Sequence, residues 1–273
     1  MNINLNIQVH INKKSISIKD RAFNFGDGLF ETIHVRNNKP LFVNDHYKRL
    51  NIGCNKLAIP IIPIKLFRES INKAISNTKD CIVKIIYSRG LSEHGYAYPK
   101  NIIPQLYIFK KKLSKVKKKY FISLGFSKYN LQSNVYLSKI KHLNRIDQVL
   151  AFTMTGNSNN DDYILLNNDE KIIECVSSNI FFYIYNNGIF KFITPSLTNC
   201  GVDGIMKQQI IKFLKKRKIK VFEKDILKKD IIKFNGCFIC NVIKGVQFVG
   251  KIEKRNINHI IQIENLLKNY IYE

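Results

Sequence analysis

The sequence contains no long hydrophobic segment. Its richest apolar stretch, residues 57–67, is broken by Pro60 and Pro63, and no run approaches the ~18–20 residues that a membrane-spanning helix requires. The first residues alternate between polar and apolar from Asn2 to Val9, which differs from the layout of a secretory signal peptide. We therefore expect a cytoplasmic protein that has no membrane partner.

The sequence also lacks the residue spacing of a zinc site. Among its six cysteines, Cys237 and Cys240 form the one C-x-x-C pair, and no second such pair or H-x-x-x-H completes it. Both lie in an apolar, strand-like segment, in which side chains alternate between two faces, so their thiols point to opposite sides. We expect no metal, and we interpret the cysteines as small buried residues in a reducing cytosol.

Acidic residues are scarce, with 20 Asp and Glu against 45 Lys and Arg and a net charge of +25. Such an excess is typical of nucleic-acid-binding proteins, which gather their charge on one basic face with interleaved aromatic residues. Here the lysines are spread along the chain together with abundant Ile and Asn, a set that AT-rich codons explain. We therefore expect no nucleic-acid partner, although nucleic-acid binding remains the rival hypothesis. We expect a small anionic substrate, which a positive field also attracts.

The chain is long enough for two modest domains, and 45% hydrophobic residues can fill their cores. In its first part we predict strands at residues 3–9, 33–36, 39–43, 81–88 and 105–109, a hairpin turn at Asn37-Asn38, a helix capped by Asn44, and a second helix over residues 64–75. A basic run then interrupts the pattern. We therefore predict a small α/β domain at residues 1–110, a basic linker at residues 111–119 and a larger domain at residues 120–273.

The larger domain again mixes strand and helix patterns. Strands are predicted at residues 120–125, 163–166, 172–176, 179–185, 189–193 and 238–242, with a hairpin turn at residues 186–188. Helical stripes are predicted at residues 143–150, 206–214 and 257–270. The whole pattern indicates an α/β protein of the α+β type with two domains.

A lysine and a glutamate stand in settings that suit pyridoxal 5′-phosphate. Lys141 opens the segment Lys-His-Leu-Asn-Arg before a helical stripe, and a lysine amine can form a Schiff base with the cofactor aldehyde. Glu174 lies among apolar neighbours, where a carboxylate needs a cationic partner such as a protonated pyridine nitrogen. Taken alone, one lysine among many is an ordinary surface residue, and the glutamate is an ordinary strand residue.

Two segments suit a phosphate. Residues 201–206 precede a helical stripe, and the free N–H groups and positive dipole of a helix start attract anions, although glycine-rich helix starts are common. Arg49 lies on the first predicted helix, where it could pair bidentately with a phosphate or simply lie at the surface. Local sequence leaves both alternatives for Arg49 open.

Together these segments resemble the fold-type IV pyridoxal phosphate enzymes, which include the branched-chain and D-amino acid aminotransferases and aminodeoxychorismate lyase. The resemblance spans nearly the whole chain and implies a small N-terminal domain and a larger, β-barrel-like C-terminal domain. Five motifs follow in the group's order and spacing: residues 20–32, His46 with Arg49, Lys141, Glu174 with Ser177-Ser178-Asn179, and Gly204-Ile205.

Within this group, the chain is most similar to the lyases. The segment that begins at Lys141 has their pattern, Met206 stands where the aminotransferases usually have threonine, and Phe30 replaces the tyrosine of the D-amino acid aminotransferases. The resemblance implies conversion of 4-amino-4-deoxychorismate to 4-aminobenzoate and pyruvate, a step in folate biosynthesis. The alternative is a class IV aminotransferase that acts on D-amino acids or branched-chain amino acids.

The resemblance also implies a role for each site residue. Lys141 would form the Schiff base and move protons, and Glu174 would pair with the pyridine nitrogen. The small-domain loop of one subunit would reach the site of the other, which implies a homodimer. The further cofactor contacts implied are Arg49, Ser177, Ser178, Asn241 and the backbone N–H groups of Ile205 and Met206, and the substrate contacts are Phe30, Arg89, His94 and Tyr96, with His94 where related lyases often have arginine.

Overall fold

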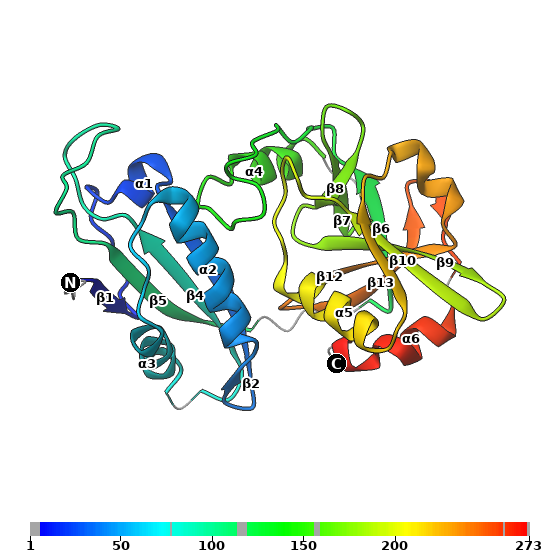
Figure 1. Cartoon of the computed structure of the whole chain (residues 1–273), viewed down its shortest axis with the longest axis horizontal. Helices are drawn as coiled ribbons and strands as arrows, with labels where there is room; N and C mark the ends of the chain where they lie inside the picture. Colours follow the sequence, from blue (N-terminus) through cyan, green and yellow to red (C-terminus); the bar gives the residue numbers. More distant parts are fainter. Residues whose placement is uncertain (1–5, 77, 114–118, 156–158, 259, 272–273) are drawn as a thin grey trace. The chain divides into compact units, whose positions relative to one another are not determined.

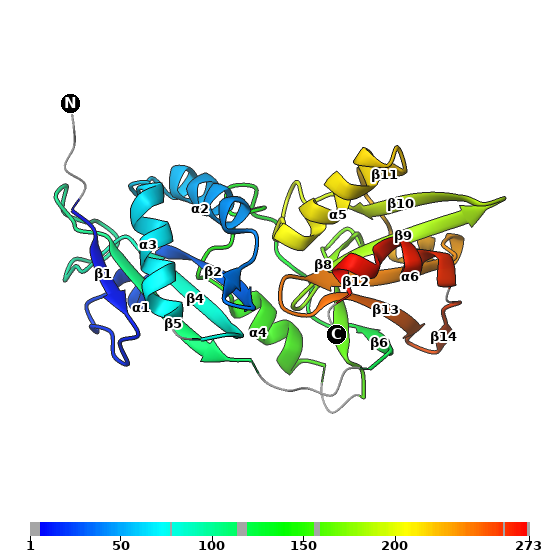
Figure 2. The same cartoon turned by 90° about the horizontal axis from the view of Figure 1, so that it is seen from below.

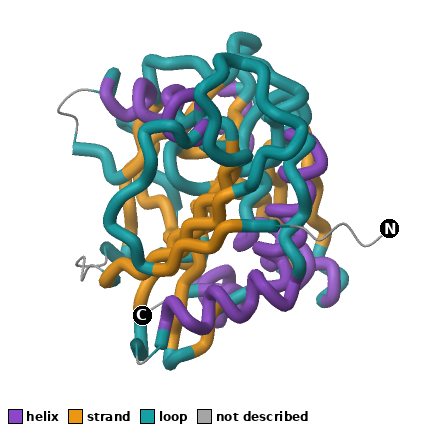
Figure 3. The backbone as a smooth tube through the Cα atoms, turned by 90° about the vertical axis from the view of Figure 1, so that its left-hand side faces the viewer, coloured by secondary structure: helices purple, strands orange, loops and turns teal. Residues whose placement is uncertain are grey.

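The computed structural model describes residues 6–76, 78–113, 119–155, 159–258 and 260–271. Its contacts divide the chain into two units (Figure 1). The first comprises Met1–Lys115 with Ile140–Asn144, and the second comprises Val116–Lys139 with Arg145–Glu273. Both units contain strands and helices, as the α/β prediction requires, and Figure 3 distinguishes the two kinds of element by colour.

The first unit is built on a five-stranded sheet in the order β1-β5-β4-β2-β3. β1 pairs with β5 in parallel, and the other pairs are antiparallel. Helices α2 and α3 lie on one face of this sheet (Figure 2). The elements are β1 (Gln8–Ile11), α1 (Arg21–Phe25), β2 (Gly28–Arg36), β3 (Lys39–Pro40), α2 (Val43–Leu57), α3 (Ile64–Ile75), β4 (Cys81–Ser88) and β5 (Gln105–Lys112).

Periodicity explains the elements of the first unit. Alternate residues of β2, Leu29, Ile33 and Val35, are buried, as expected for a strand that turns one face to the core. On α3 the buried Phe67 and Ile71 recur at helical spacing. The turn between β2 and β3 has positive φ at both Asn37 and Asn38, the backbone that a tight hairpin needs, so the predicted hairpin is confirmed.

The second unit contains a nine-stranded sheet in the order β11-β10-β9-β12-β13-β6-β7-β8, with β14 paired to β13. Its core is aliphatic and aromatic, with Leu124, Ile164, Phe182 and Ile239 fully or almost fully buried. The helix α5 packs against β11 and β12. The elements are β6 (Phe121–Phe126), α4 (Ile146–Thr153), β7 (Asp162–Leu166), β8 (Ile172–Cys175), β9 (Asn179–Asn186), β10 (Ile189–Pro195), α5 (Ile205–Lys216), β11 (Lys220–Lys224), β12 (Gly236–Asn241), β13 (Gly245–Ile252), β14 (Arg255–Asn256) and α6 (Ile261–Leu267), with short 3-10 helices η1 (Lys228–Lys233) and η2 (Lys268–Tyr270).

Some predicted bounds were wrong. The helix α2 begins at Val43, so the predicted strand over residues 39–43 ends at Pro40. Asn44 does not cap this helix, because the N-cap position belongs to Phe42 and the Asn44 Oδ1 atom instead accepts a hydrogen bond from Arg68 Nη2 at 2.7 Å. Of the first predicted strand, residues 3–5 lie outside the described residues, and β1 begins at Gln8.

The predicted apolar stripe of α4 is largely exposed among the described residues. Ile146 is 64% exposed and Val149 is 55% exposed. The buried residue of this helix is Ala151, which belongs to a cluster with Leu131 and Leu165. The face of α4 that packs within the second unit is therefore the one that carries Ala151.

The segment around Lys141 belongs to the first unit, although the predicted division put it in the larger domain. The backbone N–H of Phe30 donates to the carbonyl of Lys141 at 2.9 Å, and the N–H of Leu143 donates to the carbonyl of Gly28 at 3.0 Å. The segment is thus hydrogen-bonded to β2. In addition, β5 runs to Lys112, two residues into the predicted linker, most of which lies outside the described residues.

No helix in the described part of the chain is both long and apolar enough to cross a membrane. All six cysteines are buried and free. Cys237 and Cys240 both lie on β12, where they pair across to Phe182 and Asn179. Burial raises the pKa of both thiols, which agrees with their interpretation as small core residues.

Candidate functional site

Lys141 lies against the aromatic ring of Phe30. The Lys141 Nζ atom is 4.4 Å from the centre of this ring. The Lys141 carbonyl accepts a hydrogen bond from the backbone N–H of Phe30. Lys84 Nζ lies 3.4 Å from the centre of this ring. Lys84 is on β4 opposite Thr32 of β2, so it shares a sheet face with Phe30. The structure therefore gathers two ammonium groups around one ring.

The opposite face of β2 carries a buried charged cluster. Glu31 is fully buried, and its carboxylate accepts hydrogen bonds from Arg49 Nε at 2.7 Å and Arg49 Nη2 at 2.5 Å. His46 Nδ1 lies 2.6 Å from Glu31 Oε2. His46 and Arg49 are both on α2, three residues apart, a spacing that puts them on the same side of a helix.

The charges of this cluster shift the pKa of its members. Burial by itself would raise the pKa of Glu31, but the positive charge of Arg49 and the hydrogen bonds from His46 and Arg49 outweigh it and lower the pKa to about 2. Burial lowers the pKa of His46 from its ordinary value, and Arg49 and Lys141 lower it further against the attraction of Glu31. The imidazole is therefore neutral at pH 7, with Nδ1–H donated to Glu31.

In this tautomer, His46 Nε2 carries a lone pair. The atom is buried and has no hydrogen-bond partner among the described residues. A buried acceptor of this kind is costly unless a donor reaches it. The electrostatic influence of Lys141 on His46 shows that the lysine amine lies near this imidazole, in the same unit.

In the second unit, Glu174 orders the loop that precedes α5. Glu174 lies on β8 and is 5% exposed. Its Oε2 atom accepts the backbone N–H of Val202 at 2.9 Å, and the carbonyl of Val202 accepts Asn179 Nδ2 at 2.9 Å. The loop is therefore attached to both β8 and β9, and the buried carboxylate of Glu174 can partner a cationic group.

The helix α5 starts at Ile205, directly after the N-cap residue Gly204. A Cβ atom at Gly204 would lie 1.9 Å from Asn179 Oδ1, so any side chain here would displace Asn179. The first N–H groups of a helix have no partner inside it and lie at its positive end. The backbone of Ile205 and Met206 thus has the properties of a phosphate-binding helix start.

A buried lysine links this loop to the rest of α5. Lys207 is 1% exposed, and its Nζ atom contacts Asp203 Oδ1 at 3.2 Å and Glu223 Oε2 at 2.6 Å. Gln208 Nε2 also donates to Asp203 Oδ1 at 2.8 Å. The loop thus has side-chain bonds on both sides, which restrict the direction of its N–H groups.

Ser177, Ser178 and Asn241 form a hydrogen-bonded group in the second unit. Asn241 Nδ2 donates to Ser178 Oγ at 3.1 Å and to the carbonyl of Ser177 at 3.3 Å. Ser177 Oγ donates to Asp162 Oδ2 at 3.0 Å, and burial raises the pKa of that carboxyl. The three predicted cofactor residues therefore lie together, at the β8–β9 turn and the end of β12.

Each unit therefore carries part of a donor set that fits pyridoxal phosphate. The first unit holds a lysine amine beside an aromatic ring, and an arginine whose orientation is set by a carboxylate. The second holds a buried carboxylate, a glycine-led helix start and a group of hydroxyl and amide donors. An aldehyde, a phosphate and a pyridine nitrogen have suitable partners in this set.

The predicted substrate residues of the first unit differ in exposure and in their partners. Arg89 is 7% exposed, and its guanidinium donates to Asp27 Oδ2 at 2.8 Å and to the carbonyls of Leu57 and Ala58 at 2.6 and 2.9 Å. His94 and Tyr96 lie on an exposed loop, with Tyr96 88% exposed. The guanidinium of Arg21 shapes this loop by donating to the carbonyls of Gly95, Tyr96 and Ala97.

Two charged residues of the site were not predicted. Glu31 follows the core-facing alternation of Leu29, Ile33 and Val35, and a carboxylate in such a position needs a buried cation. Lys84 is the lysine within the apolar strand of residues 81–88. The alternation of β2 could have identified Glu31 from the sequence, whereas the relation of Lys84 to Phe30 depends on strand register.

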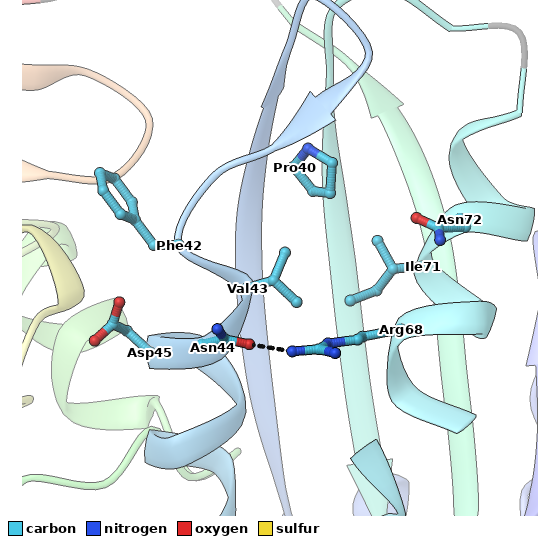
Figure 4. A pocket seen from close by; sticks show the side chains of 8 residues that line it. All are labelled: Pro40, Phe42, Val43, Asn44, Asp45, Arg68, Ile71 and Asn72. Atoms are coloured by element: carbon cyan, nitrogen blue, oxygen red, sulfur yellow. Dashed lines mark hydrogen bonds between the residues drawn. The ribbon is translucent and has the colours of Figure 1, made fainter. Parts of the chain in front are cut away.

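A pocket lies elsewhere in the first unit, where the start of α2 faces α3 (Figure 4). The hydrogen bond from Arg68 to Asn44 crosses it. It contains none of the predicted site residues, and the described residues include no cluster of His, Cys, Asp or Glu that could hold a metal ion. The side chains that line the pocket are Pro40, Phe42, Val43, Asn44, Asp45, Arg68, Ile71 and Asn72.

Comparison with known proteins gives a consistent result. The family model described as amino-transferase class IV matches residues 28–252. The chain is 25% identical over 248 residues to the aminodeoxychorismate lyase of Vibrio harveyi, covering 87% of each chain. It is 27% identical over 238 residues to the D-alanine aminotransferase of Listeria monocytogenes serotype 1/2a (strain 10403S), covering 82% of this chain and 78% of that one.

A solved structure with a similar fold is the 4-amino-4-deoxychorismate lyase from Pseudomonas aeruginosa. The TM-score is 0.86 at 25% identity, with 94% of each chain covered. These matches confirm the predicted resemblance to the fold-type IV pyridoxal phosphate enzymes and the predicted α/β fold.

Proposed function

Because this chain belongs to the class IV aminotransferase family, whose enzymes use pyridoxal phosphate, we propose that it is an aminodeoxychorismate lyase. It would convert 4-amino-4-deoxychorismate to 4-aminobenzoate and pyruvate in folate biosynthesis, as a cytoplasmic homodimer. One observation carries the choice of a lyase: the segment that begins at Lys141 has the lyase pattern and is hydrogen-bonded to β2. There the lysine amine meets Phe30, where D-amino acid aminotransferases have tyrosine.

The proposed residues would hold the cofactor by complementary charge. When bound, pyridoxal phosphate supplies an aldehyde that binds amines and a ring that withdraws electrons. Glu174 would pair with the pyridine nitrogen, because a buried carboxylate favours a cationic partner. The phosphate donors would be Arg49, the N–H groups of Ile205 and Met206, and the hydroxyl and amide groups of Ser177, Ser178 and Asn241.

Lys141 would carry the proton that the reaction moves. Its Nζ atom would take a proton from the amine-bearing ring carbon and deliver one to the methylene carbon of the enolpyruvyl group. The bond between the ring carbon and the ether oxygen then breaks, pyruvate leaves and the ring becomes aromatic. General acid–base catalysis of this kind contributes about 10²–10⁴-fold to the rate, and the gain of aromaticity makes the step irreversible.

The cofactor assignment is tested with the purified protein. We expect a yellow protein that loses its colour on borohydride treatment, with the adduct mapped to Lys141. Lys141→Ala should lose both the visible absorption band and turnover, whereas the control Lys139→Ala, at an exposed lysine two residues earlier, should keep the band. A Lys141→Ala protein that keeps its band or its turnover would overturn the assignment.

The reaction is tested with competing substrates. Aminodeoxychorismate is made in situ from chorismate and glutamine, and the release of pyruvate and 4-aminobenzoate is followed. D-Amino acids and branched-chain amino acids are then offered with 2-oxoglutarate. Rapid transamination without formation of 4-aminobenzoate would identify the aminotransferase alternative and reject the lyase.

A further inference from the structure

Lys84 occupies an unusual place for a lysine. It lies on β4, which has neighbouring strands on both sides, whereas lysine is depleted from strands and concentrates at sheet edges. Its cross-strand partners are Thr32 on β2 and Phe109 on β5. On its own strand the nearest residues of the same face are Ile82 and Ile86. An ammonium group therefore stands within a largely apolar face.

The ammonium group of Lys84 is directed to the ring that Lys141 also contacts. Lys84 Nζ lies 3.4 Å and Lys141 Nζ lies 4.4 Å from the centre of the Phe30 ring. The two nitrogen atoms are thus no further apart than the sum of these two distances. Two like charges at such a distance repel each other, and an anion that pairs with Lys84 relieves that repulsion.

The proposed substrate has an anion at a matching distance from its reacting amine. In aminodeoxychorismate the amine and the ring carboxylate are on opposite carbons of a six-membered ring. In an α-amino acid, the carboxylate is on the same carbon as the amine. A second cation that lies beside Lys141 on the same aromatic ring therefore suits the first substrate better than it suits an α-amino acid.

We propose that Lys84 is a substrate-binding residue that pairs with the ring carboxylate of aminodeoxychorismate, while Lys141 serves the amine at the opposite end. The inference rests on the proposed function and deepens it, because it names the group that selects a cyclic 4-amino acid over an α-amino acid. Lys84 has no role in moving protons. Its removal therefore weakens binding and leaves the chemical step intact.

The test compares two probes that differ in one charge. 4-Aminobenzoate has a carboxylate opposite its amine, and 4-aminobenzamide has a neutral amide in the same place. Their dissociation constants are measured by calorimetry with the pyridoxal phosphate-loaded protein. We expect wild-type protein to prefer the benzoate by about tenfold or more, the usual gain from a charge-assisted hydrogen bond. Lys84→Met should lose this preference, and Lys84→Arg should keep it.

Lys111 provides a matched control. It also pairs with a ring of the same sheet, with Nζ 5.9 Å from the centre of the Phe109 ring, and its removal lowers the net charge equally. Lys111→Met should keep the preference for the benzoate. If Lys84→Met keeps the preference, if wild-type protein has none, or if Lys111→Met loses as much, the proposal is rejected. Thermal unfolding is measured for every variant, and Lys84→Gln replaces Lys84→Met if the latter does not fold.

Steady-state kinetics separate this proposal from the proposed function. For Lys84→Met we expect KM for aminodeoxychorismate to rise about tenfold while kcat changes less than about twofold. Wild-type protein that releases no 4-aminobenzoate would reject the lyase, whatever the probes show. If wild-type protein has lyase activity and Lys84→Met has an unchanged KM, the proposed role of Lys84 is rejected and the lyase assignment stands.

Discussion

The carboxylate of Glu31 holds the guanidinium of Arg49 through two hydrogen bonds, from Nε at 2.7 Å and from Nη2 at 2.5 Å. Both residues are buried. A two-point pairing of this kind restricts the orientation of the arginine as well as neutralising its charge. Glu31 therefore determines the orientation of Arg49, the proposed phosphate donor, although Glu31 itself lies on the core-facing side of β2.

Replacing Glu31 with glutamine should strongly destabilise the first unit. The substitution keeps the size of the side chain but leaves the buried charge of Arg49 without its partner, a change that typically costs about 3–5 kcal/mol of unfolding free energy. Urea unfolding of wild-type and Glu31→Gln proteins measures the loss. Glu93→Gln is the control, because Glu93 is an exposed glutamate paired with Lys19, and its stability should match wild type.

The same pair predicts a pH dependence. The folded pKa of Glu31 is lowered from 4.5 to about 2, so the unfolded chain binds a proton first as the pH falls. The stabilisation by Glu31, about 3 kcal/mol, is fully present above pH 4.5 and is lost as the pH falls toward 2. The difference in unfolding free energy between wild type and Glu31→Gln should therefore narrow from pH 6 to pH 3. A constant difference over this range would contradict the lowered pKa.

Regular periodicity made several elements predictable. The repeat of Ile64, Phe67, Ile71 and Ile75 predicted α3, and that of residues 206–214 predicted α5, because an amphipathic helix needs only its own sequence to show its buried face. The asparagine pair at residues 37–38 predicted its hairpin in the same way. These signals are local, and the structure confirmed them.

The remaining features depend on contacts between distant segments. The residues near Lys141 join the first unit because their backbone bonds to β2, more than a hundred residues earlier. The apolar stripe of α4 resembled a core face in the sequence, but Ile146 and Val149 are exposed and Ala151 is the buried residue. The approach of Lys84 to Phe30 follows from the register of β2 against β4. No local sequence pattern specifies these contacts between distant segments.

Gly204→Ala should weaken cofactor binding. A Cβ atom would lie 1.9 Å from Asn179 Oδ1, so Asn179 must move and release the carbonyl of Val202. The loop before α5 would then lose one of its anchors, and the proposed phosphate donors at Ile205 and Met206 would be displaced. We expect the dissociation constant for pyridoxal phosphate to rise about tenfold or more, equivalent to 1.4 kcal/mol, measured by titration of the apoprotein.

Gly95→Ala is the control for this substitution. No atom lies within 4 Å of a Cβ at Gly95, so the added methyl group meets open space. This variant should bind pyridoxal phosphate as wild type does. Equal affinity in wild type, Gly95→Ala and Gly204→Ala would contradict the assignment of the phosphate to the start of α5.

Arg89→Ala should affect stability more than substrate affinity. The guanidinium donates to Asp27 and to the carbonyls of Leu57 and Ala58 at the end of α2, so truncation leaves these two part-buried carbonyls without this donor, while Asp27 keeps its hydrogen bond from Arg21. A hydrogen bond of this kind contributes about 0.5–1.5 kcal/mol, and the C-terminal end of α2 would lose its attachment to Arg89. We expect the urea midpoint to fall markedly, because these hydrogen bonds lie inside the first unit. KM for aminodeoxychorismate should stay within about twofold of wild type, a difference below 1 kcal/mol. A variant of wild-type stability with a large increase in KM would instead show that Arg89 leaves its internal partners and binds the substrate carboxylate.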